Sequence, residues 1–241
     1  MSEEAVEINV DGLILRGNIF TPDKHSKKLA VFFLHGWTGR PNKDAAKFLA
    51  ENGFSSMTFS LGGHNDSQGD INTLSREDFM HHVLAAHDFF ASKLADSTQI
   101  GAAGSSFGSY LAAVLSGLRE LACLSLRVPA NYSDEGWSEP QFPQAASFEN
   151  PEILKWRDNP LSFDATKSLQ ATHDFNGPIQ IIEAEDDDIV PHQTIQNYID
   201  AVQDKAKLEH HLMHGWPHSL GDDPERNRRY QEMLLNWLER I

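Results

Sequence analysis

The stretch GSSFG, residues 104–108, lies between an apolar segment of strand character at residues 98–104 and an apolar segment of helix character at residues 107–118. A Gly-x-Ser-x-Gly sequence in this setting is typical of a nucleophile elbow, a sharp turn that presents a serine between a strand and a helix. Small residues beside the serine let the two elements approach each other closely. The pattern predicts that Ser106 stands exposed at the tip of the turn. The Phe107 amide and the start of the helix could then stabilise an oxyanion there.

Apolar, β-rich runs alternate with segments of helix length on both sides of this turn. The runs are residues 29–34, 55–59, 99–103, 121–128, 179–184 and 208–213, and the helical segments are residues 41–52, 76–94, 107–118, 192–202 and 224–241. A first pair of strands, residues 6–10 and 13–20, flanks Asp11-Gly12, a dipeptide favoured in tight hairpins. Near-continuous apolar runs that alternate with helices favour a mostly parallel sheet covered on both faces. The sequence therefore predicts one α/β domain over residues 1–241, with eight strands. We expect the last helix to begin at Asp223 as its N-cap, with Pro224 at the first helical position.

The alternation fails between residues 131 and 177. Aromatic residues and prolines are interspersed there: Trp137, Phe142, Phe148, Trp156 and Phe163, with Pro140, Pro143, Pro151 and Pro160. An irregular segment of this length inside a compact domain is usually functional or a subdomain. We expect residues 131–177 to form a lid inserted into the sheet. The alternative is a long loop that packs its aromatic side chains on the body of the domain.

The charge and the composition argue against several classes of partner. The net charge is -15, from 35 acidic and 20 basic residues, and such a field repels phosphate backbones and anionic lipid. Neither nucleic acid nor a membrane surface is therefore an expected partner, whereas a homodimer stays open. The single cysteine, Cys123, lies in an apolar run, where we expect it to be buried. A basic segment followed by an apolar run is missing at the N-terminus, and no apolar stretch approaches membrane-spanning length, so we expect a cytoplasmic protein.

A serine nucleophile needs a base within hydrogen-bond reach, and the base needs a carboxylate to orient it. Acidic residues at positions 183 and 185–188 follow the seventh strand, at the end of a parallel sheet where ligands bind. Histidines 214 and 218 lie in the loop before the last helix. The chain thus offers a serine, an acid and a histidine in that order.

These motifs resemble those of α/β-hydrolase fold enzymes of the esterase and acylaminoacyl-peptidase-like branch, above all small feruloyl or cinnamoyl esterases with an inserted lid. The resemblance extends over nearly the whole chain. Residues 104–108 match the Gly-x-Ser-x-Gly of the family, and HGWTG at residues 35–39 matches its His-Gly-x-x-Gly oxyanion segment. The resemblance implies that the backbone amides of Trp37 and Phe107 form the oxyanion hole.

The resemblance also implies an acid and a base for Ser106. The family's acid lies in Gly-x-x-Asp-x-x-Val-Pro, which falls on Asp187 here, with alanine in place of the glycine. Asp186 and Asp188 remain alternatives. The family's base lies in a Gly-x-x-His loop, which selects His218.

One element departs from the family pattern. The usual Asp-x-Arg-Gly-His-Gly-x-Ser after the fourth strand reads SLGGHNDS at residues 60–67, and we expect its His64 to be structural. Because this loop shapes the pocket floor in the family, its changes affect the inference of the substrate more than that of the triad.

Two other clusters of polar residues suggest metal binding. The acidic run at residues 183–188 could bind a hard cation, but a strand sends neighbouring side chains to opposite faces. The histidines form two groups, which are His81, His82 and His87, and His210, His211 and His214. Neither group has the His-Glu-x-x-His frame. We expect no metal site, and histidines that face solvent or are satisfied in packing.

The resemblance predicts a serine hydrolase that cleaves a small-molecule carboxylic ester through an acyl-enzyme, without a cofactor. Amide, peptide and thioester hydrolysis use the same residues, and a non-catalytic binding protein is the alternative from a different class. We expect Trp137, Trp156 and Trp216 to line the substrate pocket. Core packing is the alternative for Trp37 and Trp216.

Overall fold

A computed structural model describes residues 1–23, 26–141 and 151–241, and its strands form one sheet. The strands are β1 Ser2–Val10, β2 Leu13–Thr21, β3 Leu29–Leu34, β4 Ser56–Phe59, β5 Gln99–Ser105, β6 Leu124–Arg127, β7 Ile179–Asp186 and β8 Leu208–Pro217. Their order in the sheet is β1-β2-β4-β3-β5-β6-β7-β8. Neighbours from β4 to β8 pair in parallel, whereas β1 pairs with β2, and β2 with β4, in antiparallel fashion. The predicted eight-stranded, mostly parallel sheet is confirmed.

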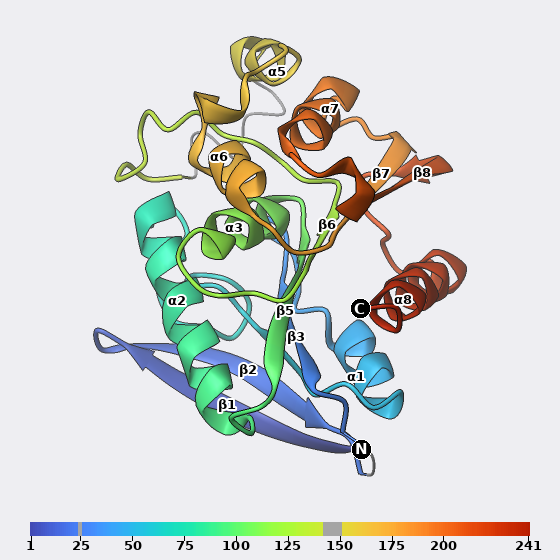
Figure 1. The fold of residues 1–241 in the computed structure, drawn as a ribbon. Helices are drawn as coiled ribbons and strands as arrows, with labels where there is room; N and C mark the ends of the chain where they lie inside the picture. The colour runs from blue at the N-terminus through green and yellow to red at the C-terminus, as the bar shows by residue number, and fades with distance from the viewer. Residues whose placement is uncertain (24–25, 142–150) are drawn as a thin grey trace.

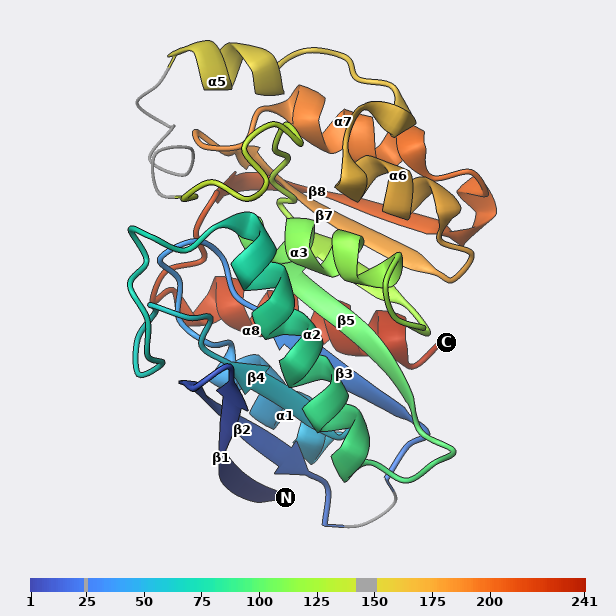
Figure 2. The same ribbon diagram turned by 90° about the vertical axis from the view of Figure 1, so that its left-hand side faces the viewer.

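Helices cover both faces of this sheet, as Figure 1 and Figure 2 show. The main helices are α1 Lys43–Glu51, α2 Arg76–Lys93, α3 Phe107–Ser116, α6 Lys167–Asp174, α7 His192–Ala201 and α8 Pro224–Leu238. Side chains of α2, α3, α6 and α7 share one buried apolar cluster, and those of α1 and α8 share the other. The near-continuous apolar runs of β3, β4, β5 and β6 are explained by this arrangement, because these central strands bury both of their faces, whereas β1 at the edge of the sheet alternates buried and exposed residues.

Two local signals in the sequence are found where they were predicted. Asp11 and Gly12 have φ values of 51° and 87° between β1 and β2, the left-handed conformation that a two-residue hairpin turn requires. The Asp223 side chain accepts hydrogen bonds from two amides in the first turn of α8, and Pro224 occupies the first position of that helix.

The segment at residues 131–177 is inserted between β6 and β7, and its described part contains more helix than the sequence indicated. It contains α5, Pro151–Arg157, and a short 3-10 turn, Phe163–Ala165, before α6. Because α6 packs against α3 and α7, it belongs to the helical layer of the body. In contrast, α5 lies at the outer end of the molecule (Figure 1). Phe142, Pro143 and Phe148, which contributed to the lid prediction, lie outside the described residues.

Among the described residues, no helix combines the length and apolar character needed to cross a membrane.

Cys123 is a buried free thiol, as expected, and its burial raises its pKa to about 12.

Candidate active site

The turn from β5 into α3 holds Ser106 in an unusual backbone conformation. Its φ is 55° and its ψ is -116°, a region that residues with a side chain rarely adopt. The flanking glycines make the turn sterically feasible. A Cβ at Gly104 would lie 2.4 Å from the Gly108 carbonyl oxygen, and one at Gly108 would lie 2.1 Å from the Leu34 carbonyl oxygen. The Gly-x-Ser-x-Gly pattern therefore reflects the close approach of β3, β5 and α3.

Ser106 is the first member of a chain of three hydrogen-bonded side chains. The Oγ atom of Ser106 lies 3.0 Å from Nε2 of His218, and Nδ1 of His218 lies 2.7 Å from Oδ2 of Asp187. Only 12% of the His218 side chain and 5% of the Asp187 side chain are exposed. A neutral imidazole with its proton on Nδ1 donates to Asp187 and accepts from Ser106, so one tautomer satisfies both contacts.

The structure distinguishes among the three adjacent aspartates. The Oδ1 atom of Asp187 accepts hydrogen bonds from the amides of Ile189 at 2.9 Å and Val190 at 2.8 Å. These bonds turn the carboxylate toward the histidine loop. Asp186 and Asp188 are exposed, and within the described residues only Asp187 of the three contacts His218.

The loop after β3 passes directly over the nucleophile turn. A Cβ at Gly36 would lie 3.2 Å from the Ser105 carbonyl oxygen and 3.4 Å from the Cβ atom of Ser106. Phe107 is the first residue of α3, and helices leave their first amides without an internal partner. In the part of the chain that the structure describes, neither the Trp37 amide nor the Phe107 amide has an acceptor. Both amides predicted to form the oxyanion hole therefore belong to segments that adjoin Ser106, and they lack an acceptor among the described residues.

Side chains beneath this loop hold it in place. The Trp37 ring makes edge contacts with the rings of Phe107, Phe79 and His64, with centroids 5.4, 5.6 and 5.3 Å away. His64 is buried and bonded to the Gly62 carbonyl oxygen, as expected of a structural residue. The indole of Trp37 therefore packs on the core.

His35 ties the same loop to the chain after β4. Its Nδ1 donates to the Gly36 carbonyl oxygen at 2.8 Å, and its Nε2 accepts from the Leu61 amide at 3.0 Å. Burial lowers the pKa of His35 to about 3, so the ring is neutral.

Lowering the pH should therefore destabilise the fold at pH values well above those at which carboxylates titrate. Burial lowers the pKa of His35 to about 3 and that of His82 to about 4, both from an ordinary 6.5. Below pH 6.5 these two histidines bind protons in the unfolded chain but stay neutral in the folded chain. The free energy of unfolding therefore falls as the pH falls toward their lowered pKa values. Each histidine should contribute a slope approaching about 1.4 kcal/mol per pH unit.

Urea unfolding of the parent protein and of His82→Leu between about pH 7 and about pH 4.5 measures this effect. We expect a shallower loss of stability in the variant. Parallel curves for the two proteins would contradict the assignment of His82 as a buried neutral group.

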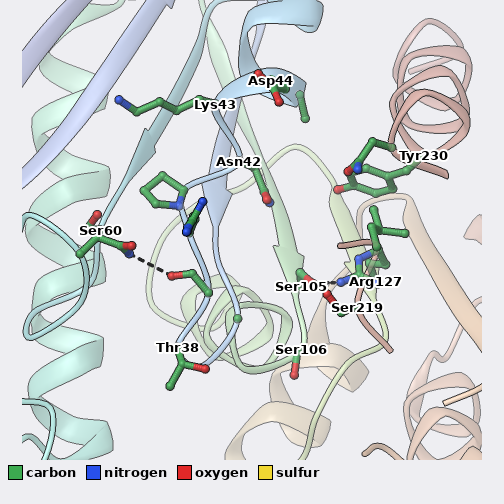
Figure 3. Close-up of a pocket in the computed structure, with 18 of the residues that line it drawn as sticks. Thr38, Asn42, Lys43, Asp44, Ser60, Ser105, Ser106, Arg127, Ser219 and Tyr230 are labelled. Carbon is green, nitrogen blue, oxygen red and sulfur yellow. Dashed lines mark hydrogen bonds between the residues drawn. The ribbon is translucent and has the colours of Figure 1, made fainter. Parts of the chain in front are cut away.

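A cleft of about 1390 Å³ opens at Ser106 and His218. It runs between the loop after β3 and the loop that joins β8 to α8 and reaches Arg127 and Tyr230. Figure 3 shows Ser105, Arg127 and Ser219 together along one side, with Ser106 at the end of the cleft nearest Thr38. A substrate that enters this cleft would meet the serine and the histidine together.

The predicted substrate tryptophans do not line this cleft. Trp216 is 7% exposed and packs in the apolar cluster beneath α1 and α8, so it has the core role that was its alternative. Trp137 is partly buried and lies beside Lys167, whose ammonium is 5.5 Å from its ring. Trp156 is half-buried on α5.

A second hollow brings α5 close to the acid loop. It has a volume of about 480 Å³ and is lined by Leu154 and Lys155 of α5 together with Asp187 and Ile189. Ile189 also lines the cleft that contains Ser106. The inserted segment therefore approaches the site through α5 and the acid loop.

The other carboxylates and histidines near β7 and β8 pair with one another. Glu183 is buried and accepts hydrogen bonds from His192 and, at 2.9 Å, from His210. Glu185 lies 3.0 Å from His214. Within residues 1–23, 26–141 and 151–241, no group of three or more such side chains is arranged to hold a metal ion.

Comparison with known proteins identifies the family. Residues 48–241 match the prolyl oligopeptidase family. The chain belongs to this family. A comparison with curated proteins gives no significant match.

Solved structures similar to this family member cover almost its whole length. An α/β serine hydrolase homologue from Coxiella burnetii has a TM-score of 0.72 and 20% identity, over 99% of this chain and 98% of its own. Est1E from Butyrivibrio proteoclasticus with ferulic acid bound has a TM-score of 0.70 and 19% identity, over 98% and 100%. The esterase Pf2001 from Pyrococcus furiosus has a TM-score of 0.71 and 19% identity, over 99% and 92%. The α/β-hydrolase fold is thus confirmed. Together with the match to the prolyl oligopeptidase family, this fold makes the chain an α/β-fold serine hydrolase.

One residue of this prolyl oligopeptidase family member was not singled out in the sequence. Arg127 ends β6 and donates hydrogen bonds to the His218 carbonyl oxygen, at 2.7 Å, and to Oγ of Ser105. The available signal was a single charge inside the apolar run of residues 121–128.

Proposed function

We propose that the chain is a carboxylesterase that hydrolyses small-molecule carboxylic esters through an acyl-enzyme on Ser106. The observation that carries the proposal is the continuous hydrogen-bonded chain from Asp187 through His218 to Ser106, at a strained turn that opens into a cleft. Serine acts as a nucleophile when a base removes its proton, and the base works best when a carboxylate fixes its tautomer.

Each residue has one task in the proposed reaction. His218 takes the proton of the Ser106 hydroxyl as its oxygen attacks the ester carbonyl carbon, and Asp187 stabilises the imidazolium that results. The amides of Trp37 and Phe107 stabilise the negative oxygen of the tetrahedral intermediate. His218 then protonates the departing alcohol, and water hydrolyses the acyl-enzyme by the same steps. No cofactor takes part.

Peptide or amide hydrolysis is the second candidate, because the chain belongs to the prolyl oligopeptidase family. The same residues would act, with His218 protonating a leaving nitrogen in place of an oxygen. Thioester hydrolysis also fits the arrangement. The discriminating quantity is therefore the relative kcat/KM for an ester and for an amide of the same acyl group.

A fluorophosphonate probe and a panel of substrates test the proposal. The probe should label Ser106, as located by mass spectrometry of the digested protein. The panel consists of nitrophenyl esters from acetate to long chains, methyl ferulate and an aminoacyl anilide. Methyl ferulate is included because Est1E, solved with ferulic acid bound, has the same fold. Faster cleavage of the anilide than of every ester would favour the peptidase alternative, and a protein that is not labelled and cleaves nothing would favour a binding protein.

The part of residues 131–177 that contains α5 is proposed to act as a lid that affects selectivity more than chemistry, because α5 lies beside the acid loop. Neither Trp137 nor Trp156 lines the cleft at Ser106, so Trp156→Ala on α5 and Trp137→Ala should act by shifting this segment. Each should change the ratio of activity on aromatic and short aliphatic esters by up to roughly tenfold, the scale of about 1–3 kcal/mol that a changed apolar contact is worth. The melting temperature should fall only modestly. Phe142, another aromatic residue of this segment, lies outside the described residues.

Trp216→Phe is the matched control, since Trp216 packs in the core on the other face of the sheet. It should lower the melting temperature and leave the ratio unchanged. If the Trp137 and Trp156 variants kept the parent ratio and melted far lower, the segment would be a structural part of the body.

A further inference from the structure

Arg127 contacts both the turn that carries Ser106 and the loop that carries His218. Its guanidinium donates one hydrogen bond to Oγ of Ser105 and another to the backbone carbonyl oxygen of His218, at 2.7 Å. Its own backbone carbonyl oxygen accepts from the Ser106 amide at 2.9 Å. A single residue at the end of β6 therefore connects the nucleophile and the base, which are 112 positions apart in the sequence.

Packing alone does not account for an arginine at this position. The residue is 8% exposed, and among the described residues no carboxylate forms an ion pair with its guanidinium. Burial lowers the pKa of Arg127, and the nearby Tyr230 and Asp187 offset part of this effect. A buried charge without an ion pair is expensive, and an apolar side chain of similar length would fill the same space at lower cost.

The two acceptors of the guanidinium suit a role in positioning. Arginine presents its N–H groups in a rigid planar fork, so two bonds to different segments fix the distance between those segments. His218 needs such support, because it lies between the end of β8 at Pro217 and the start of α8 at Pro224. Within the described residues, Arg127 is the donor to the His218 carbonyl oxygen.

We propose that Arg127 is a positioning residue that holds the His218 loop against the nucleophile turn and so sets the contact between Nε2 of His218 and Oγ of Ser106. This inference rests on the proposed function. Arg127 acts through His218 and Ser105 and takes no part in the proton transfers. We therefore expect the loss of the Arg127 guanidinium to lower kcat with little change in KM, because the geometry of the reacting groups changes while the substrate contacts remain.

The central experiment compares Arg127→Met, Arg127→Lys and Ser105→Ala with the parent protein. Arg127→Met should lower kcat and the rate of fluorophosphonate labelling by roughly a hundredfold, the loss expected for a displacement of about 1 Å, with KM changed by less than about threefold. Arg127→Lys should recover part of this loss, because one ammonium can reach one acceptor but cannot reproduce the fork. Ser105→Ala should have a smaller effect, which should shrink in the Arg127→Met background because the two residues share one bond.

Arg76→Met is the matched control for removing a buried guanidinium. Arg76 is fully buried on α2 and donates to the carbonyl oxygens of Ser133 and Glu135. The Arg76→Met variant should lose thermal stability and keep the kcat of the parent protein. Equal melting losses in Arg76→Met and Arg127→Met with kcat retained in both would make Arg127 merely structural.

Two other results would overturn the positioning role. A large rise in KM at unchanged kcat would make Arg127 a substrate-binding residue of the cleft that it lines. If Arg127→Met does not fold, the other two variants decide: full activity in both Arg127→Lys and Ser105→Ala would contradict the proposal.

The proposed function is tested separately. A parent protein whose Ser106 is not labelled refutes the serine mechanism and, with it, this role of Arg127. A parent that is labelled but cleaves amides leaves the positioning test intact.

Discussion

Ser106→Ala is expected to abolish ester hydrolysis while the protein stays folded. The hydroxyl of Ser106 is the group that His218 contacts at the tip of the strained turn, and alanine removes only that oxygen. Loss of the nucleophile from a serine triad lowers kcat on the order of a million-fold, with a residual rate from the oxyanion donors and from binding. The measurement is the kcat of the purified variant on the best ester of the panel, together with its melting temperature.

Ser105→Ala is the matched control for this variant, because it removes the neighbouring hydroxyl from the same turn. Oγ of Ser105 is buried against Arg127 and does not contact His218. Its loss should lower activity far less than the loss of Ser106. A Ser106→Ala variant that keeps more than about a tenth of the parent activity would remove Ser106 from the proposed role and make Ser105 the next candidate.

The nucleophile turn could be predicted because its signals are local. Close packing of β3, β5 and α3 demands glycine at positions 104 and 108, and the apolar runs on either side identify the strand and the helix. The same holds for Asp11-Gly12 and for Asp223-Pro224, where one or two residues fix a turn or a helix start.

The choice of the acid needed more than the residues of the acidic run. Three successive aspartates follow β7, and only the resemblance to a family singled out Asp187. The structure adds a physical reason, which is that the amides of Ile189 and Val190 bind its carboxylate. Aspartate commonly accepts hydrogen bonds from amides shortly after it in the chain, so this turn was a usable local signal.

The misplaced or missed features depend on contacts between distant segments. The face of the sheet on which Trp216 lies depends on the irregular pairing of β7 and β8 between Ala184 and Asp186, which alternation along β8 alone does not reveal. Helix α6 follows a Thr166 N-cap, but it is short, and the proline-rich stretch before it hides its pattern. The contact of Arg127 with the His218 loop joins residues 91 positions apart.

Asp187→Asn should lower kcat by roughly a thousandfold or more, the largest loss among the three adjacent aspartates. The asparagine oxygen can still accept from the amides of Ile189 and Val190, so the loop should keep its shape. Its NH₂ group then faces Nδ1 of His218, which must accept a hydrogen bond and carry its proton on Nε2. In that tautomer the imidazole cannot take the proton of Ser106, so the base is lost although every atom stays in place.

Asp186→Asn and Asp188→Asn are the matched controls, because they make the same change at exposed neighbours that do not contact His218. Both should stay within a fewfold of the parent in kcat, since surface changes away from the site have small effects. All three variants should melt at similar temperatures, which ties the loss in Asp187→Asn to chemistry and not to folding. If Asp186→Asn or Asp188→Asn were the most damaging of the three, Asp187 would not be the acid that orients the base, and the contact at 2.7 Å would have no catalytic role.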